Sequence, residues 1–323
     1  MSEHVLKWAH GEAVVLSTAA VLADCRFNLG GKAFLPFARA PWMGTVTDMS
    51  IIGHLRELGG DFVCVPMGSG GPAPQAPPEW AALMDRPRDW PIHGPAADEE
   101  WTIVSADASS VTLALDYPET SPVLRLERRV AARPDAPALD STLTLFARRA
   151  APISVGLHPI FRLPEQPGRL RLEAAFDFGL VHPRQVAGEQ EFSSLATVPQ
   201  ANGPVDLSHS PLGSQKNLNV QLCGMRSPMK ATWLDEGAGM ILDWDRAQLP
   251  SLQIWHTDRG VDVPPWNGQY RGLGLEPIAA AFDLNDAIST GPNPINRRGV
   301  ATAIDIAPET PTIIRHSVVA FSS

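Results

Sequence analysis

Two short segments, 153–158 and 272–276, each end on an ionisable residue that is followed directly by proline. In an extended strand, alternate side chains point to opposite faces, so His158 and Glu276 each share a face with only glycine or serine. Small side chains leave volume above a sheet, and glycine in a strand often marks the close approach of a ligand. Because proline removes a backbone donor, we expect both side chains to stand where a strand leaves the sheet, at the edge of a cavity.

An imidazole and a carboxyl group that face one cavity can act as general acid and general base. Taken singly, a histidine at a strand end is more often a hydrogen-bonded structural residue, and a glutamate before proline is more often solvated. The same pattern occurs twice here, with complementary groups at His158 and Glu276, which favours a proton-transfer site. The residues alone leave both interpretations open.

A third segment, 251–256, places an amide and an indole on one strand face, at Gln253 and Trp255. The amide can bond hydroxyl groups in both directions, and the indole can stack on the C–H face of a sugar. The alternative for Trp255 is core packing. His93 precedes Gly94 in a proline-containing stretch and is by itself only a weak indication of a site.

The elements that must position these side chains are predicted to be half-buried antiparallel strands. Apolar and polar residues alternate with period two at 111–117, 124–130, 139–145 and 170–173. In the second of these stretches, Leu124, Leu126 and Val130 share the predicted core face.

Turn-forming residues are plentiful, with 26 glycines and 31 prolines, which favours many strands joined by turns over long helices. Ala13–Ser17 is predicted as the first strand, and Ile51–Leu58 and Pro78–Leu83 as short helices. No composition break marks a linker and no repeat has a fixed period. We therefore expect an all-β fold of two large packed sheets in one domain spanning residues 1–323.

One long segment, 66–98, carries eight prolines and the run Gly68–Gly71. A long loop inside a compact domain is usually functional or disordered. Trp80, Trp90 and His93 lie in it, which suits a lid or rim over a ligand. The alternative is a surface excursion whose aromatic side chains pack down onto the protein.

Composition excludes several classes of protein. The net charge is −9 and no basic block exceeds two residues, so the concentrated basic footprint of a nucleic-acid-binding protein is missing. The three cysteines are widely spaced without a CxxC pair, which predicts neither a zinc site nor a disulfide framework but reduced thiols in a cytoplasmic protein.

Nothing in the sequence predicts a membrane protein, since no run approaches the ~20 apolar residues of a membrane span. Residues 13–23 are apolar enough for a signal peptide. However, acidic residues precede them, and Asp24 occupies a position that needs a small residue for lipoprotein cleavage. A strand is therefore the preferred interpretation.

Four motifs, taken in order, resemble those of the aldose 1-epimerases, or galactose mutarotase-like proteins. No single motif is specific, but the order and rough spacing of the four are, and the resemblance covers roughly residues 10–320. The motifs are the histidine strand Gly156–Phe161, the late glutamate strand Gly274–Pro277, the early His93-Gly94 pair with Trp101 downstream, and the glutamine segment Pro250–Trp255.

The resemblance implies a β-supersandwich of many antiparallel strands with few short helices, which binds a sugar on its concave face. It implies interconversion of the α and β anomers of a free aldose, with no cofactor and no metal. Glu276 would be the base that takes the proton of the C1 hydroxyl, and His158 the acid that protonates the ring oxygen. His93 and Gln253 would hold sugar hydroxyls, beside Trp255. The only partner expected is a small-molecule sugar, with no nucleic acid and no membrane, and the chain is expected to be a monomer or a homodimer.

The sequence departs from the family's pattern at two places. Typical members carry an Asn-Arg pair where this chain has residues 65–71, and an aspartate that grips ring hydroxyls where residues 215–218 contain no carboxylate. The substrate therefore need not be galactose or glucose.

Two alternatives to an epimerase of free aldoses remain. A hexose-phosphate mutarotase would bring clustered arginines to the pocket, for which Arg56, Arg128 and Arg162 are candidates. A non-catalytic carbohydrate-binding or sensor protein would keep Trp255 and Gln253 but would not need both His158 and Glu276. The presence of both favours an enzyme.

Overall fold

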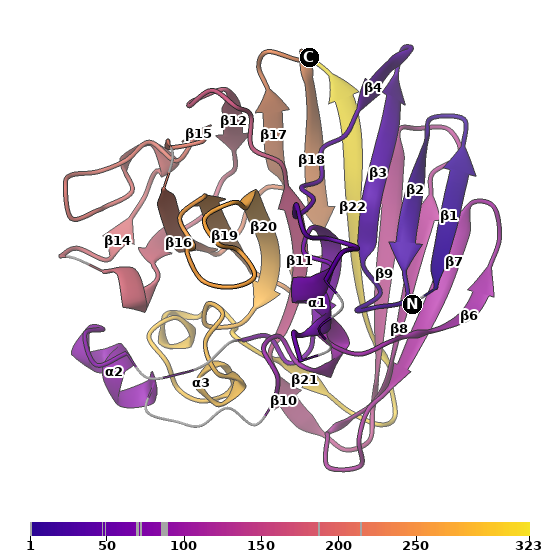
Figure 1. Ribbon diagram of the computed structural model, residues 1–323. Coiled ribbons are helices and arrows are strands. Elements are labelled where there is room, and N and C mark those ends of the chain that lie inside the picture. The colour runs from indigo at the N-terminus through magenta and orange to yellow at the C-terminus, as the bar shows by residue number, and fades with distance from the viewer. Residues whose placement is uncertain are drawn as a thin grey trace.

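The computed structural model describes residues 2–46, 48, 50–68, 71, 73–84, 90–186, 188–213 and 215–323. These residues form two large antiparallel sheets that stack on each other (Figure 1). The expectation of an all-β fold is confirmed. No described helix is long and apolar enough to cross a membrane.

The first sheet carries the predicted site. Its order is β1-β2-β3-β5-β11-β20-β19-β16-β13-β14, with β4 paired to β3. The strands are β1 Glu3–Trp8, β2 Gly11–Leu16, β3 Leu22–Leu29, β4 Lys32–Phe34, β5 Gly60–Cys64, β11 Val155–Phe161, β13 Phe178–Val181, β14 Glu191–Phe192, β16 Lys216–Cys223, β19 Ser251–Asp258 and β20 Arg271–Ala279.

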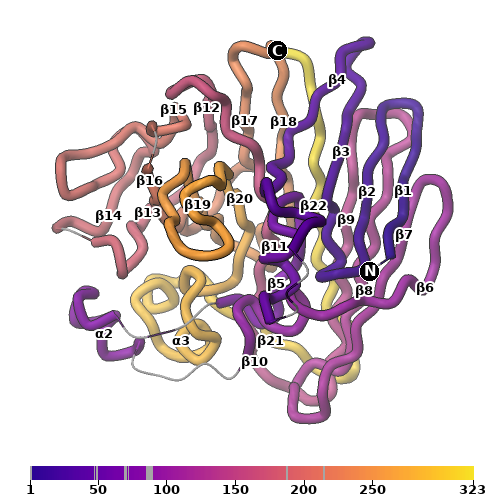
Figure 2. Tube along the Cα trace, viewed as in Figure 1, coloured from indigo at the N-terminus to yellow at the C-terminus, as the bar shows by residue number. Residues whose placement is uncertain are grey.

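The second sheet has the order β15-β12-β17-β18-β22-β9-β8-β7-β6, and the short β10 pairs with β21 beside it. Figure 2 shows β9, β8 and β7 of this sheet passing behind β1, β2 and β3. The strands are β6 Thr102–Ala106, β7 Ser110–Asp116, β8 Val123–Ala132, β9 Ala138–Ala147, β10 Ala151–Ile153, β12 Leu170–Glu173, β15 His209–Ser210, β17 Met229–Trp233, β18 Ala238–Trp244, β21 Ile304–Ile306 and β22 Thr312–Ser322.

Helices are short and lie in the connections. The α-helices are α1 Gly53–Arg56, α2 Pro78–Met84 and α3 Asp286–Thr290, and the 3₁₀ turns are η1 Pro95–Ala97, η2 Pro183–Gln185, η3 Leu195–Thr197 and η4 Asn296–Arg298. The helix predicted at Pro78–Leu83 is confirmed. The helix predicted over Ile51–Leu58 is confined to Gly53–Arg56.

The main core fills the space between the sheets. Leu157 and Leu275, on the inner faces of β11 and β20, are fully buried in it. The opposite face of these two strands is also buried, because connecting segments cover it. Central strands with two buried faces can place polar groups in a dry environment only where those groups find partners.

Two details of the predicted strands are wrong. Leu124 is exposed, because a bulge between Val123 and Arg125 shifts the register of β8 and turns Val123 into the core instead. The strand predicted at Ala13–Ser17 is the second strand, since β1 precedes it and pairs with it. The apolar–polar alternation in Glu3–Trp8 is short, so its pairing with β2, rather than its local pattern, makes this segment a strand.

A buried ion cluster joins the sheets directly behind the predicted site. Asp61 Oδ2 on β5 accepts hydrogen bonds from Arg128 Nη2 at 2.5 Å and His316 Nε2 at 2.8 Å. Burial by itself raises the pKa of Asp61, but the charge of Arg128 and the contact with His316 outweigh it, so that this pKa lies below its usual value. All three side chains are almost inaccessible to solvent.

We expect Asp61→Asn to destabilise the fold by about 3–5 kcal/mol, because it leaves the Arg128 guanidinium buried without its counter-charge. Urea denaturation measures the loss. Asp24→Asn is the matched control, since Asp24 pairs with Arg39 at an exposed site, and it should cost less than about 1 kcal/mol. Equal effects of the two substitutions would contradict the role given to the buried cluster.

Candidate active site

Strands β11 and β20 lie side by side and bring His158 and Glu276 together. Their register pairs Gly156 with Ile278 and Ile160 with Gly274, which places residue 158 opposite residue 276. Directly opposite side chains on neighbouring antiparallel strands share a face and lie close together. Accordingly, Nε2 of His158 lies 3.3 Å from Oε1 of Glu276.

Contrary to the expectation from the sequence, the prolines after these residues do not end the strands. β11 continues to Phe161 and β20 to Ala279, and both regain their pairing beyond the prolines. Pro159 also keeps its place in the ladder with β5. A proline removes only its own donor, so His158 and Glu276 stand in the middle of the sheet rather than where a strand leaves it.

A row of side chains crosses five strands of the first sheet. In register order it runs through Phe62 on β5, His158 on β11, Glu276 on β20, Gln253 on β19 and Gln221 on β16. Strand parity alone puts all five on the same face. The face predicted for His158, Glu276 and Gln253 is therefore confirmed by the register.

Gln253 holds the carboxyl group of Glu276. Its Nε2 donates to Oε2 of Glu276 at 3.1 Å, while its own Oε1 is buried without a hydrogen-bond partner among the described residues. Trp255 is half-buried, and its Nε1 donates to Oδ1 of Asn217 at 3.0 Å. Gln253 thus has one polar atom bonded to Glu276 and one without a partner in the part of the chain that the structure describes.

The glycines beside the pair do not leave open volume, contrary to prediction. A Cβ on Gly156 would lie 2.7 Å from Sδ of Met67, and one on Gly272 would lie 2.8 Å from the Tyr270 ring. A Cβ on Gly274 would lie 2.3 Å from Oε1 of Glu276. These glycines therefore admit neighbouring side chains, and Gly274 admits the carboxyl group of Glu276 itself.

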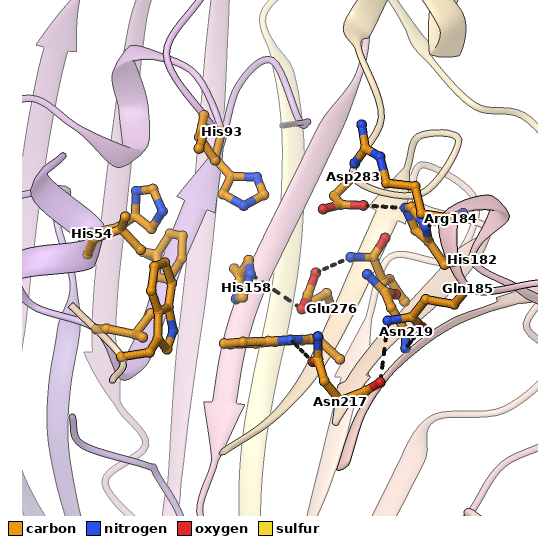
Figure 3. A pocket seen from close by; sticks show the side chains of 17 residues that line it. His54, His93, His158, His182, Arg184, Gln185, Asn217, Asn219, Glu276 and Asp283 are labelled. Carbon is orange, nitrogen blue, oxygen red and sulfur yellow. Dashed lines mark hydrogen bonds and ion pairs between the residues drawn. The ribbon is translucent and has the colours of Figure 1, made fainter. Parts of the chain in front are cut away.

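The cavity lies above Phe62, His158, Glu276 and Gln253 of this row and has a volume of about 300 Å³. That is within the usual range for small-molecule sites. Figure 3 shows His158 and Glu276 between two groups of polar side chains, with His54 and His93 to one side and Asp283, Arg184, His182, Gln185 and Asn219 to the other. The cavity is lined by His54, Leu55, Leu58, Phe62, Ile92, His93, His158, His182, Arg184, Gln185, Asn217, Asn219, Gln253, Trp255, Trp266, Glu276 and Asp283.

The five residues predicted for the site all line this cavity, and the long 66–98 segment contributes two lining residues. His93 is 7% exposed, and its ring centroid lies 5.3 Å from that of His158. Trp80 is fully buried against Phe282, so here the alternative of a packed-down aromatic is right. Trp90 is half-buried and does not line the cavity. Residues 69, 70, 72 and 85–89 of this segment lie outside the described residues.

Comparisons with solved structures find the same architecture. A GalM/aldose epimerase homologue from C. elegans matches with a TM-score of 0.68 at 13% identity, over 99% of both chains. A galactose mutarotase-like protein from Clostridium acetobutylicum matches with a TM-score of 0.67 at 12% identity, over 99% of this chain and 95% of that one. A galactose mutarotase related enzyme from Lactobacillus acidophilus matches with a TM-score of 0.59 at 13% identity, over 99% and 98%.

The fold is that of the galactose mutarotase-like proteins. The resemblance inferred from four motifs is thereby confirmed at the level of fold. No family model and no curated protein matches the sequence.

On this galactose mutarotase-like fold, the cavity contains a carboxylate and a guanidinium that sequence reasoning missed. Oδ1 of Asp283 accepts a hydrogen bond from Nε2 of His182 at 2.8 Å. Arg184, two residues after His182, donates from Nη2 to the carbonyl of Gly71 at 2.7 Å. Asp283 follows β20 and Arg184 follows β13. Neither lies in 65–71 or 215–218, the two places where the sequence departs from the family's pattern.

One signal could have found part of this wall. Asn217, Asn219 and Gln221 alternate with apolar residues along β16, as Gln253 and Trp255 do along β19. Their parity marks a polar face of the same kind. His54, Asp283 and Arg184 stand outside regular strands, where no periodicity indicates which way a side chain points.

The three arginines considered for a phosphate site do not line the cavity. Arg128 is buried between the sheets with Asp61, and Arg162 pairs with Glu236 at a different hollow. Arg56 bonds the carbonyl of Ile51. These three candidates therefore do not form the arginine cluster that a hexose-phosphate mutarotase would need.

Electrostatics bias the central pair toward its uncharged form. Burial, and then the negative charge of Asp283, raise the pKa of Glu276 well above its usual value, and the hydrogen bond from Gln253 opposes this only in part. Burial, and then the neighbouring His93 and His54, lower the pKa of His158 well below its usual value. In a dry site, the neutral forms of both groups are favoured.

Among the described residues, no group of three or more His, Cys, Asp or Glu side chains could hold a metal ion. Of the four imidazoles that line the cavity, those of His54, His93 and His158 contact one another as packed rings. The chemistry that these residues offer is proton transfer.

Asp283→Asn should lower the pKa of Glu276, because it removes the negative charge that disfavours ionisation of the buried carboxyl group. The proton of Glu276 should then be lost at a lower pH than in the wild type. A ¹³C NMR titration of labelled glutamate carboxyl groups measures this. The exposed Asp305→Asn is the control and should leave the titration unchanged; an unshifted Glu276 in the Asp283 variant would refute the electrostatic coupling.

Proposed function

We propose that residues 1–323 form one domain that acts as an aldose 1-epimerase and interconverts the α and β anomers of a free aldose. One observation carries the proposal: an imidazole and a carboxyl group stand 3.3 Å apart on the floor of a cavity lined by polar and aromatic side chains. Opening of a sugar ring needs one proton removed and one delivered at neighbouring oxygens. The fold supports the proposal because its structural neighbours include proteins described as mutarotase-like.

In the proposed reaction, Glu276 takes the proton of the C1 hydroxyl while His158 gives a proton to the ring oxygen. The bond between C1 and the ring oxygen breaks and C1 becomes an aldehyde. Rotation about C1–C2 then presents the other face of the aldehyde, and ring closure returns both protons. Each well-placed proton-transfer group contributes about 10²–10⁴-fold.

The pair needs one proton in total. Ionised Glu276 with protonated His158, and protonated Glu276 with neutral His158, carry the same number of protons and differ by a transfer across the 3.3 Å contact. Ring opening uses the first form and leaves the second, which ring closure then uses. Because burial lowers the pKa of His158 and raises that of Glu276, the pH range over which the pair holds one proton is wide.

The walls of the cavity suit a ligand rich in hydroxyl donors. Oδ1 of Asn219 and Oε1 of Gln253 are buried acceptors without hydrogen-bond partners among the described residues. Buried acceptors normally have a partner, so their presence beside a cavity favours a ligand that supplies one. Trp255 offers an apolar plane for the C–H face of a sugar, and His93 lies next to the acid. The proposed chemistry needs no cofactor.

Charge balance favours a free sugar over a phosphorylated one. Arg184 is the arginine that lines the described part of the cavity, and the carboxylate of Asp283 lies in the same wall. Arg184, together with the larger effect of His182, lowers the pKa of Asp283, so the negative charge of Asp283 partly neutralises the positive charge of Arg184. A phosphate group would meet the carboxylate as well as the guanidinium.

Two accompanying proposals rest on less specific features. The three cysteines are free and buried, which agrees with a reducing, cytoplasmic environment. The chain is proposed to act as a monomer or a homodimer, with no nucleic-acid partner.

Glu276→Gln and His158→Ala should each lower the mutarotation rate by at least about 10²-fold, because each removes one of the two proton-transfer groups. Polarimetry on freshly dissolved aldoses measures the rate, and sugar binding should stay detectable by calorimetry. Glu165→Gln and His209→Ala are the controls, since both residues are exposed, and should behave as the wild type. A wild type that binds sugars but accelerates none of them would instead support a non-catalytic binding or sensor protein.

A free aldohexose should be a better substrate than its 6-phosphate, because the cationic group in the described wall is opposed by Asp283. Comparison of kcat/KM for the two forms of one sugar by polarimetry tests this. Arg184→Gln should lower the small activity on the phosphate no more than that on the free sugar. A phosphate preference that Arg184→Gln abolishes would establish a hexose-phosphate mutarotase.

A further inference from the structure

His158 lacks the usual device that orients a proton-transfer histidine. In most such sites, the ring nitrogen that does not face the substrate bonds a carboxylate or a carbonyl, which fixes the orientation of the ring. Here Nε2 faces Glu276, while Nδ1 is buried and makes no hydrogen bond to another described residue. Apart from a contact with its own backbone, the ring is tied to no other element through Nδ1, so packing must set the plane of this imidazole.

Phe62 lies flat against that plane. It is the residue directly opposite His158 on the neighbouring strand β5, so the register of the sheet fixes its place. The two ring centroids are 4.4 Å apart and the planes differ by 15°. Phe62 is fully buried, and aromatic rings packed at this distance attract each other beyond the effect of burial alone.

His54 closes the other side of Phe62. Its ring stacks on Phe62 with centroids 5.1 Å apart and planes 28° apart, so Phe62 lies between two imidazoles. His54 is itself anchored, because its Nδ1 lies 3.1 Å from the carbonyl oxygen of Ala97. The backbone N–H of Gly53 also donates to Oδ1 of Asp98 at 2.6 Å, which ties the start of α1 to the same segment.

His93 braces the stack from its edge. Its ring centroid lies 5.3 Å from those of both His54 and His158, nearly perpendicular to each, at 68° and 71°. Phe62, backed by His54, thus covers one face of His158, while His93 and Trp255 meet the ring nearly perpendicularly, with centroids 5.3 Å and 6.3 Å away. A tilt of the His158 ring would collide with Phe62 on one side.

We propose that this ring stack orients His158, and that Phe62 and His54 are positioning residues for it. The proposal rests on the proposed role of His158 in proton transfer. It assigns His54 a mechanical role, as the back support of Phe62, rather than a role in carrying protons. A flat ring at position 54 should therefore suffice, whereas an aliphatic side chain should not.

Three variants separate these possibilities. Phe62→Leu and His54→Leu remove flat rings and should lower kcat for mutarotation by about 10²-fold, the effect expected of a misplaced catalytic group, with KM little changed. His54→Phe keeps a flat ring and should retain most of kcat. If His54→Phe loses as much as His54→Leu, a nitrogen of His54 is required and the mechanical role is overturned.

Phe161→Leu is the matched control for lost packing. Phe161 is also a fully buried ring on β11, stacked on Phe37 with centroids 5.1 Å apart, but it does not line the cavity. It should lose stability as Phe62→Leu does while keeping kcat. An equal loss of kcat in Phe161→Leu would show that the effect is general softening of the sheet, and would overturn the proposal.

NMR of the histidine rings tests the stack without reference to activity. In the intact protein with ¹³C-labelled histidine, the His158 ring signals should be displaced upfield by the flat Phe62 ring. Phe62→Leu should abolish that displacement, His54→Leu should reduce it, and His54→Phe should keep it. Unchanged His158 signals in Phe62→Leu would overturn the proposal even in an active enzyme. The expected changes in a protein that shows no mutarotation would support the stack while refuting the proposed function.

Discussion

The pairing of β11 with β20 is the constraint on which the site depends. Their register sets His158 opposite Glu276, and it carries along Phe62 on one side and Gln253 on the other. Since side chains alternate with period two, a slip of one residue would turn Glu276 into the core between the sheets and bring Leu275 to the cavity. Leu157 and Leu275 oppose that slip, because both are fully buried in that core.

Strand parity is local, which is why the sequence predicted the faces of His158, Glu276, Gln253 and Trp255 and the all-β fold. What surrounds those faces is not local. The space above Gly156 is taken by Met67, and the wall opposite His93 is built by Asp283 and Arg184, which come from distant connections. Loop side chains carry no periodicity, so neither their direction nor their partners can be derived from spacing. The motif resemblance supplied the reaction but placed its aspartate at 215–218, where this chain has none.

The two faces of the first sheet show two ways to keep a carboxyl group inside the protein. Asp61 faces the second sheet and stays ionised, because Arg128 and His316 both reach one of its oxygens. The next residue, Phe62, faces the cavity, where no cation among the described residues pairs with Glu276 and burial favours its protonated form. The first arrangement fixes a charge in one place and joins the sheets. The second allows a proton to pass between Glu276 and His158, which the proposed acid–base chemistry requires.

This difference explains why a ring stack suits His158 better than a hydrogen bond would. A carboxylate on Nδ1 would stabilise the imidazolium and hold the proton on His158. The plane of Phe62 fixes the direction of Nε2, but it favours the charged form of the ring far less than a carboxylate would. With Nε2 of His158 3.3 Å from Glu276 and neither group held in its charged form by an ion pair of the Asp61 kind, burial favours the form in which Glu276 carries the proton and His158 is neutral. In the proposed reaction, ring closure uses this neutral form, and a single proton transfer between Glu276 and His158 gives the ionised form that ring opening uses.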